Sequence, residues 1–202
     1  MAISTYSELT TAVANWLARA DLTSRIPEAI AMAEAHFNDV IRHRQMEQRA
    51  TATASEYMAL PADYLEMRNI KVQGSPSRKL EPISSFAADY SAESGSTVSY
   101  VLHANQIWLV PAPAGTEVIE IDYYKQIPAL SATTTTNWLL TQSPDVYLYG
   151  ACFHALTLVQ DDQRVVMCGQ YMSSIIDRLT GADKRQRWSG GELRVRSATA
   201  VV

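Results

Sequence analysis

The residues best able to do chemistry in this chain are its histidines, its cysteines and a few paired carboxylates. His36 and His43 lie seven positions apart on one expected helix, but a zinc site there would need a third ligand. Cys152 and Cys168 lie sixteen positions apart and match no metal-binding or redox spacing. We interpret the two histidines as helix-surface residues and the cysteines as reduced thiols packed within helices.

The paired carboxylates also fail to form a catalytic pattern. Glu120 and Asp122 fall two positions apart on one face of an expected strand, too close to straddle a sugar as glycosidase carboxylates must. Asp161 and Asp162 mark a helix break, where capping explains them. The sequence has no phosphate-binding loop, dinucleotide fingerprint, nucleophile elbow or His-Glu-x-x-His helix. We therefore expect a protein that is not an enzyme, with no catalytic residues, cofactor or metal.

Length and composition are those of a globular protein that buries a core. The chain has 202 residues, of which 47% are hydrophobic and 19% charged. The charged fraction is below the usual quarter, which suggests surface buried against other chains. No signal peptide opens the sequence, and no apolar run approaches the roughly 20 residues that span a bilayer. We expect synthesis in a reducing cytoplasm and no membrane contact.

Charge is distributed unevenly along the chain. Residues 184–202 hold five basic residues and one acid, a net +4, which leaves −8 on residues 1–183 because the whole chain is −4. A positive tail on a negative body suggests that the tail binds a partner that the body does not. An acidic body argues against general nucleic-acid binding, which depends on neutralising phosphates. This argument does not apply to an acidic surface that lines a channel through which DNA passes without being bound.

Helical patterns occupy both ends of the chain. Thr5 to Glu8 fit a capping box, and apolar residues follow at three- and four-residue steps. A second helix is expected from Pro27 to about Arg44, antiparallel to the first. The helical period returns at Ser143, and a last helix is expected from about Gln163 to Leu179 or beyond.

The middle third has the alternation typical of strands. Strands are expected at 49–54, 67–72 and 118–124, with a hairpin of 100–103 and 106–110 and a short helix at 84–90. The fold class is therefore α+β: a helical bundle of N- and C-terminal helices, an inserted antiparallel β domain and an extended C-terminal tail. We expect the bundle at 1–47 and 138–186, the β-rich insertion at 48–137 and the tail at 187–202.

Aromatic residues favour interfaces, because tyrosine and tryptophan outnumber phenylalanine. We interpret Trp16 and Trp108 as half-buried core aromatics. Trp188 stands just before the flexible joint at Ser189 to Gly191, and we expect it to anchor the tail in a pocket of a partner.

Several motifs follow one another in order along the chain. The helix pair is followed by Leu60-Pro61-Ala62-Asp63-Tyr64-Leu65, Trp108-Leu109-Val110-Pro111-Ala112-Pro113-Ala114-Gly115, Asn137-Trp138-Leu139-Leu140 and Pro144-Asp145-Val146-Tyr147-Leu148-Tyr149-Gly150-Ala151. This series resembles the head-to-tail adaptor (connector) proteins of tailed bacteriophages, particularly short-tailed ones. The resemblance covers most of residues 1–180. It implies a structural virion protein in the neck, a ring of twelve subunits that joins the portal to the tail or nozzle protein and continues the DNA channel used in genome ejection.

The resemblance also implies roles for particular residues. In similar proteins a C-terminal extension docks on the portal protein, so we expect portal contacts from Trp188, Leu193, Arg194, Val195 and Arg196. We expect Glu120 and Asp122 to line the channel and keep DNA from adhering as it passes without specific binding. Two alternatives stay open: another phage neck or tail-completion protein, and a ligand-binding module that uses the β domain.

Overall fold

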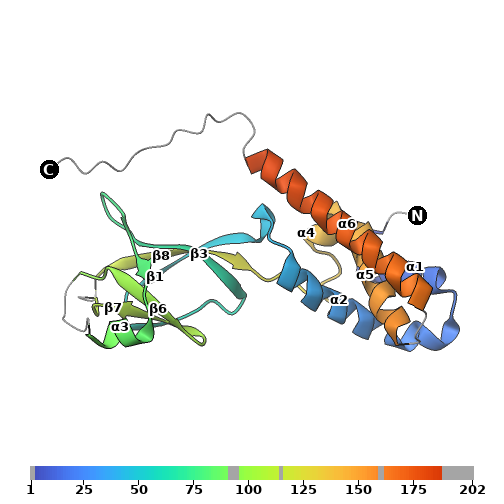
Figure 1. Ribbon diagram of the computed structural model, residues 1–202, viewed down its shortest axis with the longest axis horizontal. Coiled ribbons are helices and arrows are strands. Elements are labelled where there is room, and N and C mark those ends of the chain that lie inside the picture. Colours follow the sequence, from blue (N-terminus) through green and yellow to red (C-terminus); the bar gives the residue numbers. More distant parts are fainter. Residues whose placement is uncertain (1–2, 91–95, 114–115, 159–161, 188–202) are drawn as a thin grey trace.

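Helices from both ends of the chain pack together in one half of the molecule, and the strands of the middle third form the other half (Figure 1). The computed structural model describes residues 3–90, 96–113, 116–158 and 162–187. The helical half consists of α1 (Tyr6–Leu17), η1 (Ala20–Arg25), α2 (Ile26–Val40), α4 (Trp138–Gln142), α5 (Pro144–Thr157) and α6 (Asp162–Arg187). The α+β class predicted from the sequence is confirmed.

Helix α1 begins as its sequence predicts. The Glu8 backbone N–H donates to Thr5 Oγ1 at 3.3 Å, and the Glu8 carboxylate accepts from the Thr5 backbone N–H at 3.1 Å. This reciprocal pair satisfies two donors that the first turn leaves without helical partners. The helix ends where Ala18 adopts a left-handed conformation with φ of 53°.

Helix α5 lies at the centre of the helical half, packed against α1, α2 and α6. Gly150 permits its closest approach to α2, because a Cβ there would lie 2.7 Å from Cζ of Phe37. One turn earlier, Tyr147 meets the Phe37 ring edge to face, with centroids 5.2 Å apart. Cys152 and Cys168 are buried thiols in α5 and α6, as predicted, and burial raises the pKa of Cys152 to about 12.

The β half is a sandwich of two four-stranded sheets. One has the order β1 (Glu47–Thr53), β8 (Val118–Lys125), β3 (Tyr64–Val72), β4 (Arg78–Lys79); the other has β2 (Tyr57–Ala59), β7 (Gln106–Val110), β6 (Ser99–His103), β5 (Glu81–Pro82). Pairing is antiparallel except between β5 and β6. Ile70, Ile121, Ile107 and Leu109 are among the buried side chains of its core. The short helix α3 (Ser85–Tyr90) places Ala88 against Val101 and Val110.

Buried polar groups hold the segment between β8 and α4 against α2. Glu34 Oε1 accepts from the Leu130 backbone N–H at 2.8 Å and from the Tyr147 hydroxyl at 3.2 Å. The Asn137 side-chain amide donates to the Tyr147 oxygen at 2.6 Å and to the Pro128 carbonyl at 2.8 Å. Burial raises the pKa values of Glu34 and Tyr147. The core of the helical half therefore includes Leu130, which precedes the domain boundary expected at residue 138.

Two chain crossings connect the halves, and polar contacts brace both. In the first, Arg42 Nε lies 2.6 Å from Glu66 Oε2 on β3. In the second, the Gln126 backbone N–H donates to the Asp63 carbonyl, and the Tyr123 hydroxyl donates to the Asp63 carboxylate, each at 2.8 Å. The β half is thus tied to the helices on two sides.

The first crossing corrects one prediction. Helix α2 ends at Val40 instead of continuing to about Arg44, and a short turn, η2 (Arg44–Met46), leads into β1. His43 is consequently not on a helix surface but 2% exposed, with its ring stacked on Trp138 at a centroid distance of 5.0 Å. The helical spacing of apolar residues continues past Val40 in the sequence, but tertiary packing turns the chain there.

Candidate assembly surfaces

The last turn of α6 is joined to the first residue of β1 by a group of charged side chains. We call His43, Glu47, Arg68, Asp183 and Arg187 the junction cluster. Arg187 Nε donates to Asp183 Oδ2 at 2.6 Å, and its Nη2 lies 2.6 Å from Glu47 Oε1, which also pairs with Arg68. The cluster ties the C-terminal end of α6 to the start of β1.

Asp183 and His43 lie at the buried centre of the cluster. The Asp183 side chain is 3% exposed and lies 3.6 Å from His43 Nε2. Burial lowers the pKa of His43, an effect that the nearby Asp183 carboxylate opposes. The imidazole is therefore neutral near pH 7. Removing the cation that pairs with a buried carboxylate of this kind strongly destabilises the fold.

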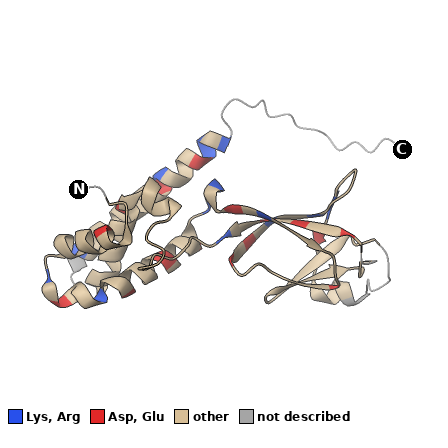
Figure 2. Cartoon of the chain, turned by 180° about the vertical axis from the view of Figure 1, so that it is seen from behind, with Lys and Arg blue, Asp and Glu red and all other residues tan. Residues whose placement is uncertain are grey.

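Three of the five basic residues of the positively charged segment 184–202 belong to the last turn of α6. They are Lys184, Arg185 and Arg187. Figure 2 shows these basic residues at the end of the helix. Cations there interact favourably with the carbonyl end of the helix dipole. The other two basic residues, Arg194 and Arg196, lie outside the described residues.

The outer face of the sheet β1-β8-β3-β4 carries the two carboxylates predicted to line a channel. Glu120 and Asp122 share that face, and Arg49 Nε lies 2.9 Å from a carboxylate oxygen of each. Lys71 Nζ lies 2.9 Å from Glu120, and the Gln73 amide donates to Glu120 at 3.0 Å. These hydrogen bonds and cations hold the pKa of Glu120 below its usual range. Both carboxylates therefore have cationic partners, which lessens the repulsion expected from the sequence.

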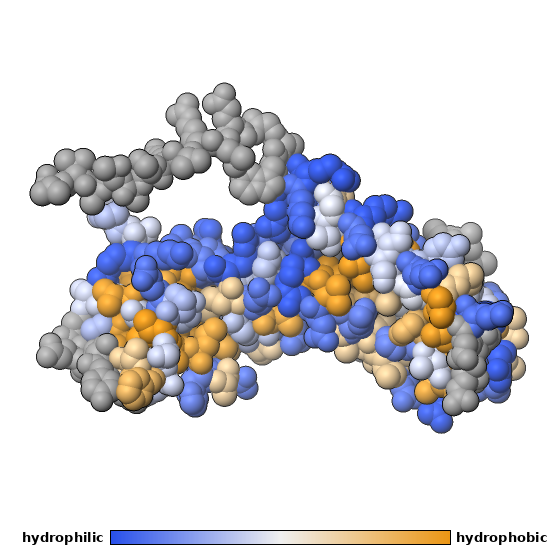
Figure 3. Space-filling view, in the orientation of Figure 1, coloured by the Kyte–Doolittle hydropathy of each residue, from blue (hydrophilic) through white to orange (hydrophobic). Residues whose placement is uncertain are grey.

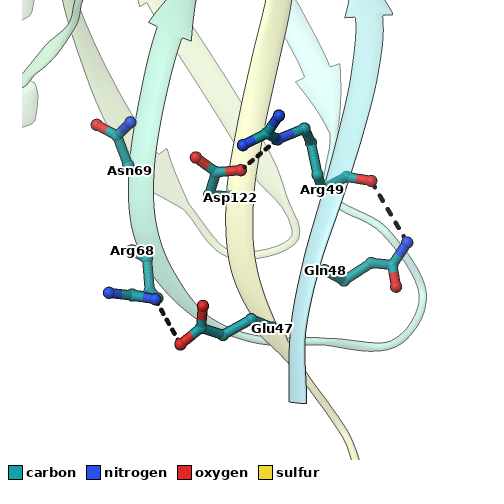
Figure 4. A pocket seen from close by; sticks show the side chains of 6 residues that line it. All are labelled: Glu47, Gln48, Arg49, Arg68, Asn69 and Asp122. Atoms are coloured by element: carbon teal, nitrogen blue, oxygen red, sulfur yellow. Dashed lines mark hydrogen bonds and ion pairs between the residues drawn. The ribbon is translucent and has the colours of Figure 1, made fainter. Parts of the chain in front are cut away.

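A polar hollow of about 640 Å³ lies on this face, next to the junction cluster (Figure 4). Its lining side chains are charged or amides, and those of Arg49 and Arg68 are already paired with Asp122 and Glu47. The six lining residues are Glu47, Gln48, Arg49, Arg68, Asn69 and Asp122. Among the described residues, no group of three or more His, Cys, Asp and Glu side chains is placed to hold a metal ion. The hollow is therefore a charged surface feature whose cations are already paired with carboxylates.

A family model described as SU10 adaptor protein matches residues 4–196, nearly the whole chain. The chain belongs to the SU10 adaptor protein family. The resemblance to phage head-to-tail adaptors drawn from the sequence is thereby confirmed. A comparison with curated proteins gives no match. The family is one of structural phage proteins, so this adaptor is a virion component.

Exposed aromatic residues mark a second surface of the adaptor, on the far side of the β half. Tyr57 on β2 stacks on Trp108 of β7, with centroids 5.9 Å apart and ring planes 17° from parallel. Tyr57 is 55% exposed, and Phe86 on the neighbouring α3 is 72% exposed. We call Tyr57, Phe86 and Trp108 the aromatic ledge. Figure 3 shows hydrophobic residues gathered on this half of the molecule.

The helical half of the adaptor has a row of aromatic side chains of its own. The Arg164 guanidinium lies over the Trp16 ring, 4.7 Å from its centroid. Trp16 meets Tyr149 edge to face at 6.2 Å, and Tyr149 lies 5.1 Å from Tyr171 on α6. The predicted half-burial of Trp16 and Trp108 is confirmed. None of the described helices is long and apolar enough to cross a bilayer.

The predicted portal-binding residues fall outside the described part of the adaptor. These are Trp188, Leu193, Arg194, Val195 and Arg196. Sequence reasoning did not find the junction cluster, because its members come from segments far apart in the chain. It also missed the aromatic ledge, because nothing local in the sequence shows that the Tyr57 and Phe86 side chains are exposed.

Proposed function

We propose that this protein is a head-to-tail adaptor that forms a ring of twelve subunits, joins the portal to the tail and continues the DNA channel. The match of the adaptor family to residues 4–196 is the observation that supports this most. The division into a helical half and a β half linked by braced crossings supports it too, since a connecting ring needs two faces held at a fixed separation.

Residues 188–202 are the portal-docking segment in this proposal. Their starting point is held by Arg187, which bonds to Asp183 and Glu47. Trp188 and Leu193 would fill pockets of the portal protein, and Arg194 and Arg196 would meet its acids. A ring repeats each of these contacts, so weak individual contacts become strong together.

The docking test compares the full chain with a chain that ends at Arg187, so that the junction cluster remains intact. We expect both to give the same far-ultraviolet circular dichroism and urea midpoint, while the shortened chain no longer co-sediments with portal rings. Trp188→Ala should weaken binding, and Trp16→Phe in the helical half should not. Undiminished co-sedimentation of the shortened chain would overturn the docking proposal.

Stoichiometry needs a separate measurement. Native mass spectrometry of portal rings with saturating adaptor should show twelve added copies per portal ring. Without portal, the protein is expected to form an assembly of fewer than twelve subunits, because the portal supplies the template for the ring. A different number of bound copies would overturn the dodecamer, and a failure to bind portal would favour another neck or tail-completion role.

The β half is proposed to contact the tail or nozzle protein through the aromatic ledge. Exposed aromatic residues on a rigid sheet are typical interface anchors. Tyr57→Ala should reduce binding of the tail component, whereas Thr11→Ala on the exposed face of α1 should leave it unchanged.

For the channel, we propose that Glu120 and Asp122 face the DNA together with Arg49 and Lys71. Their charges nearly balance, so DNA passes this surface without specific binding.

A further inference from the structure

The outer face of α2 is apolar in its middle and acidic at both ends. Ala31 and Met32 are exposed, Met32 by 46%, and Ala35 is exposed one turn later. Glu28 and Asp39 are exposed at the two ends of the same face, at helical spacings of three and four residues. We call these five residues the α2 stripe. An exposed helix face ordinarily carries polar side chains along its middle, so this one is suited to contact with an apolar surface.

Helix α6 has a complementary outer face. Val166 and Met167 are 57% and 37% exposed near its start, and Ser174 is exposed two turns later at helical spacing. Lys184 and Arg185 are exposed near its end, and neither side chain has a hydrogen bond or ion pair with another described residue. We call these five residues the α6 stripe. It is apolar at one end and basic at the other.

The two stripes lie on opposite sides of the helical half. Helix α5 packs against both α2 and α6 and lies between them (Figure 1). Both outer helices run toward the β half, because α2 ends at Val40 and Asp183 near the end of α6 lies 3.6 Å from His43. Asp39 is therefore at the same end of the helical half as the two cations of the α6 stripe. The apolar residues of both stripes lie farther from the β half.

This arrangement fits a head-to-tail contact between two copies of the chain. Closed rings are built from heterologous interfaces, in which one patch of a subunit meets a different patch of its neighbour. A rotation of about 30° between neighbours of a twelve-membered ring keeps α6 of one subunit within about 30° of parallel to α6 of the next, and so nearly parallel to the neighbouring α2. Two α2 stripes facing each other would bring acids together in either direction, which disfavours a two-fold contact.

We propose that the α6 stripe of one subunit packs against the α2 stripe of its neighbour, and that this contact closes the ring. The inference rests on the proposed function, since it names the surface through which the ring forms. Met32 packs on the apolar end of the α6 stripe, and Ala35 lies opposite Ser174, where small side chains let the helices approach closely. Asp39 meets the two cations. Repetition around the ring makes these individually weak contacts strong together.

Disulfide cross-linking of the full chain tests the contact, with portal rings and without them. Ala35→Cys and Ser174→Cys are introduced into one chain, in which α5 separates the two positions. Mild oxidation should then give a ladder of covalent multimers on a denaturing gel. The native Cys152 and Cys168 are buried and should not react. Each single variant should stay monomeric, and so should the matched pair of Ser77→Cys, exposed in the β half, with Ser174→Cys.

Each other outcome has a definite meaning. The absence of a ladder in both samples would overturn the contact, and dimers from Ala35→Cys alone would show a two-fold pairing of α2 stripes instead. Native mass spectrometry of the same samples tests the proposed function separately. Portal rings that carry twelve adaptors without a ladder would leave that function intact and overturn this inference. A ladder from a chain that does not bind portal would do the opposite.

A charge exchange tests the ends of the stripes in the double-cysteine chain. Asp39→Lys should lower the yield of the ladder about tenfold, because it sets like charges against each other. Adding Lys184→Glu and Arg185→Glu to the same chain should restore the yield. All three side chains are exposed and lack partners among the described residues, so circular dichroism should show an unchanged fold. An undiminished ladder from Asp39→Lys would overturn the assigned pairing.

Discussion

The guanidinium of Arg187 lies 2.6 Å from the carboxylate of Glu47, so the last residue of a helix is bonded to the first residue of a strand. The same guanidinium donates to Asp183, which is 3% exposed. One side chain thus links the two halves of the molecule.

Loss of Arg187 should destabilise the protein. Arg187→Ala leaves the buried Asp183 carboxylate without its strongest partner, and we expect a loss of about 1–3 kcal/mol in the free energy of unfolding. Urea denaturation measures it. The control is Arg178→Ala, which breaks an exposed pair with Asp145 (side chains 63% and 38% exposed) and should cost less than about 0.5 kcal/mol. Equal losses in the two variants would contradict a special role for the junction cluster.

Stability should fall as the pH is lowered below about 6.5, the ordinary histidine value. Burial lowers the pKa values of His43 and His154, so the unfolded chain binds more protons than the folded one. Their contribution is complete above the unfolded pKa and is lost as the pH falls toward the lowered folded values. Urea midpoints measured from pH 7.5 to 5.5 should therefore decrease.

His154→Phe isolates one of these two groups. Its Nε2 is buried with no hydrogen-bond partner among the described residues, so phenylalanine should be tolerated and should flatten the decrease. Burial raises the pKa of Glu34, which shifts stability the opposite way at lower pH, and the comparison with wild type cancels that effect. An unchanged pH dependence in the variant would rule out His154 as a contributor.

A methyl group at Gly150 should be destabilising, and one at Gly181 should not. Gly150→Ala places Cβ 2.7 Å from Phe37 Cζ and 3.2 Å from the Ala33 Cβ, and we expect a loss of about 1–3 kcal/mol. At Gly181 the nearest atom is the flexible end of Arg185, 3.6 Å away, so alanine should stabilise α6 by about 0.5–1 kcal/mol. Thermal unfolding of both variants checks the difference in sign.

The buried amide of Asn137 should matter more than an ordinary helix cap. Its side chain accepts from the Leu140 N–H at 2.8 Å and donates to Tyr147 and Pro128. Asn137→Ala removes all three bonds, and we expect a loss of about 2–3 kcal/mol. At the partly buried cap of α1, Thr5→Ala should cost about 1 kcal/mol. Similar urea midpoints for the two variants would contradict the importance of the buried network.

Local rules predicted much of the fold. The capping box at Thr5, the helix start at Ser143 and the strand alternation at 118–124 depend on residues close in sequence, and the structure confirms all three. The two-residue strands β4 and β5 have too few residues for any period to show. Helix α2 ends at Val40, and beyond its end His43 stacks on Trp138, a partner far along the chain that no local pattern reveals.

The candidate surfaces were harder to predict than the fold. The sequence placed Glu120 and Asp122 on one face, but only the structure shows Arg49 and Lys71 beside them. The cations come from two other strands, and the register between those strands is a tertiary property. The junction cluster is beyond sequence reasoning for the same reason. Family membership was accessible because it depends on the order of several motifs.

The two braced crossings between the halves have a mechanical consequence. A single linker would behave as a hinge, and the β half could swing about it. Here the chain passes between the halves twice, and each passage is tied sideways, by Arg42 to Glu66 and by Gln126 to Asp63. Tension along the long axis is therefore shared by two segments of backbone.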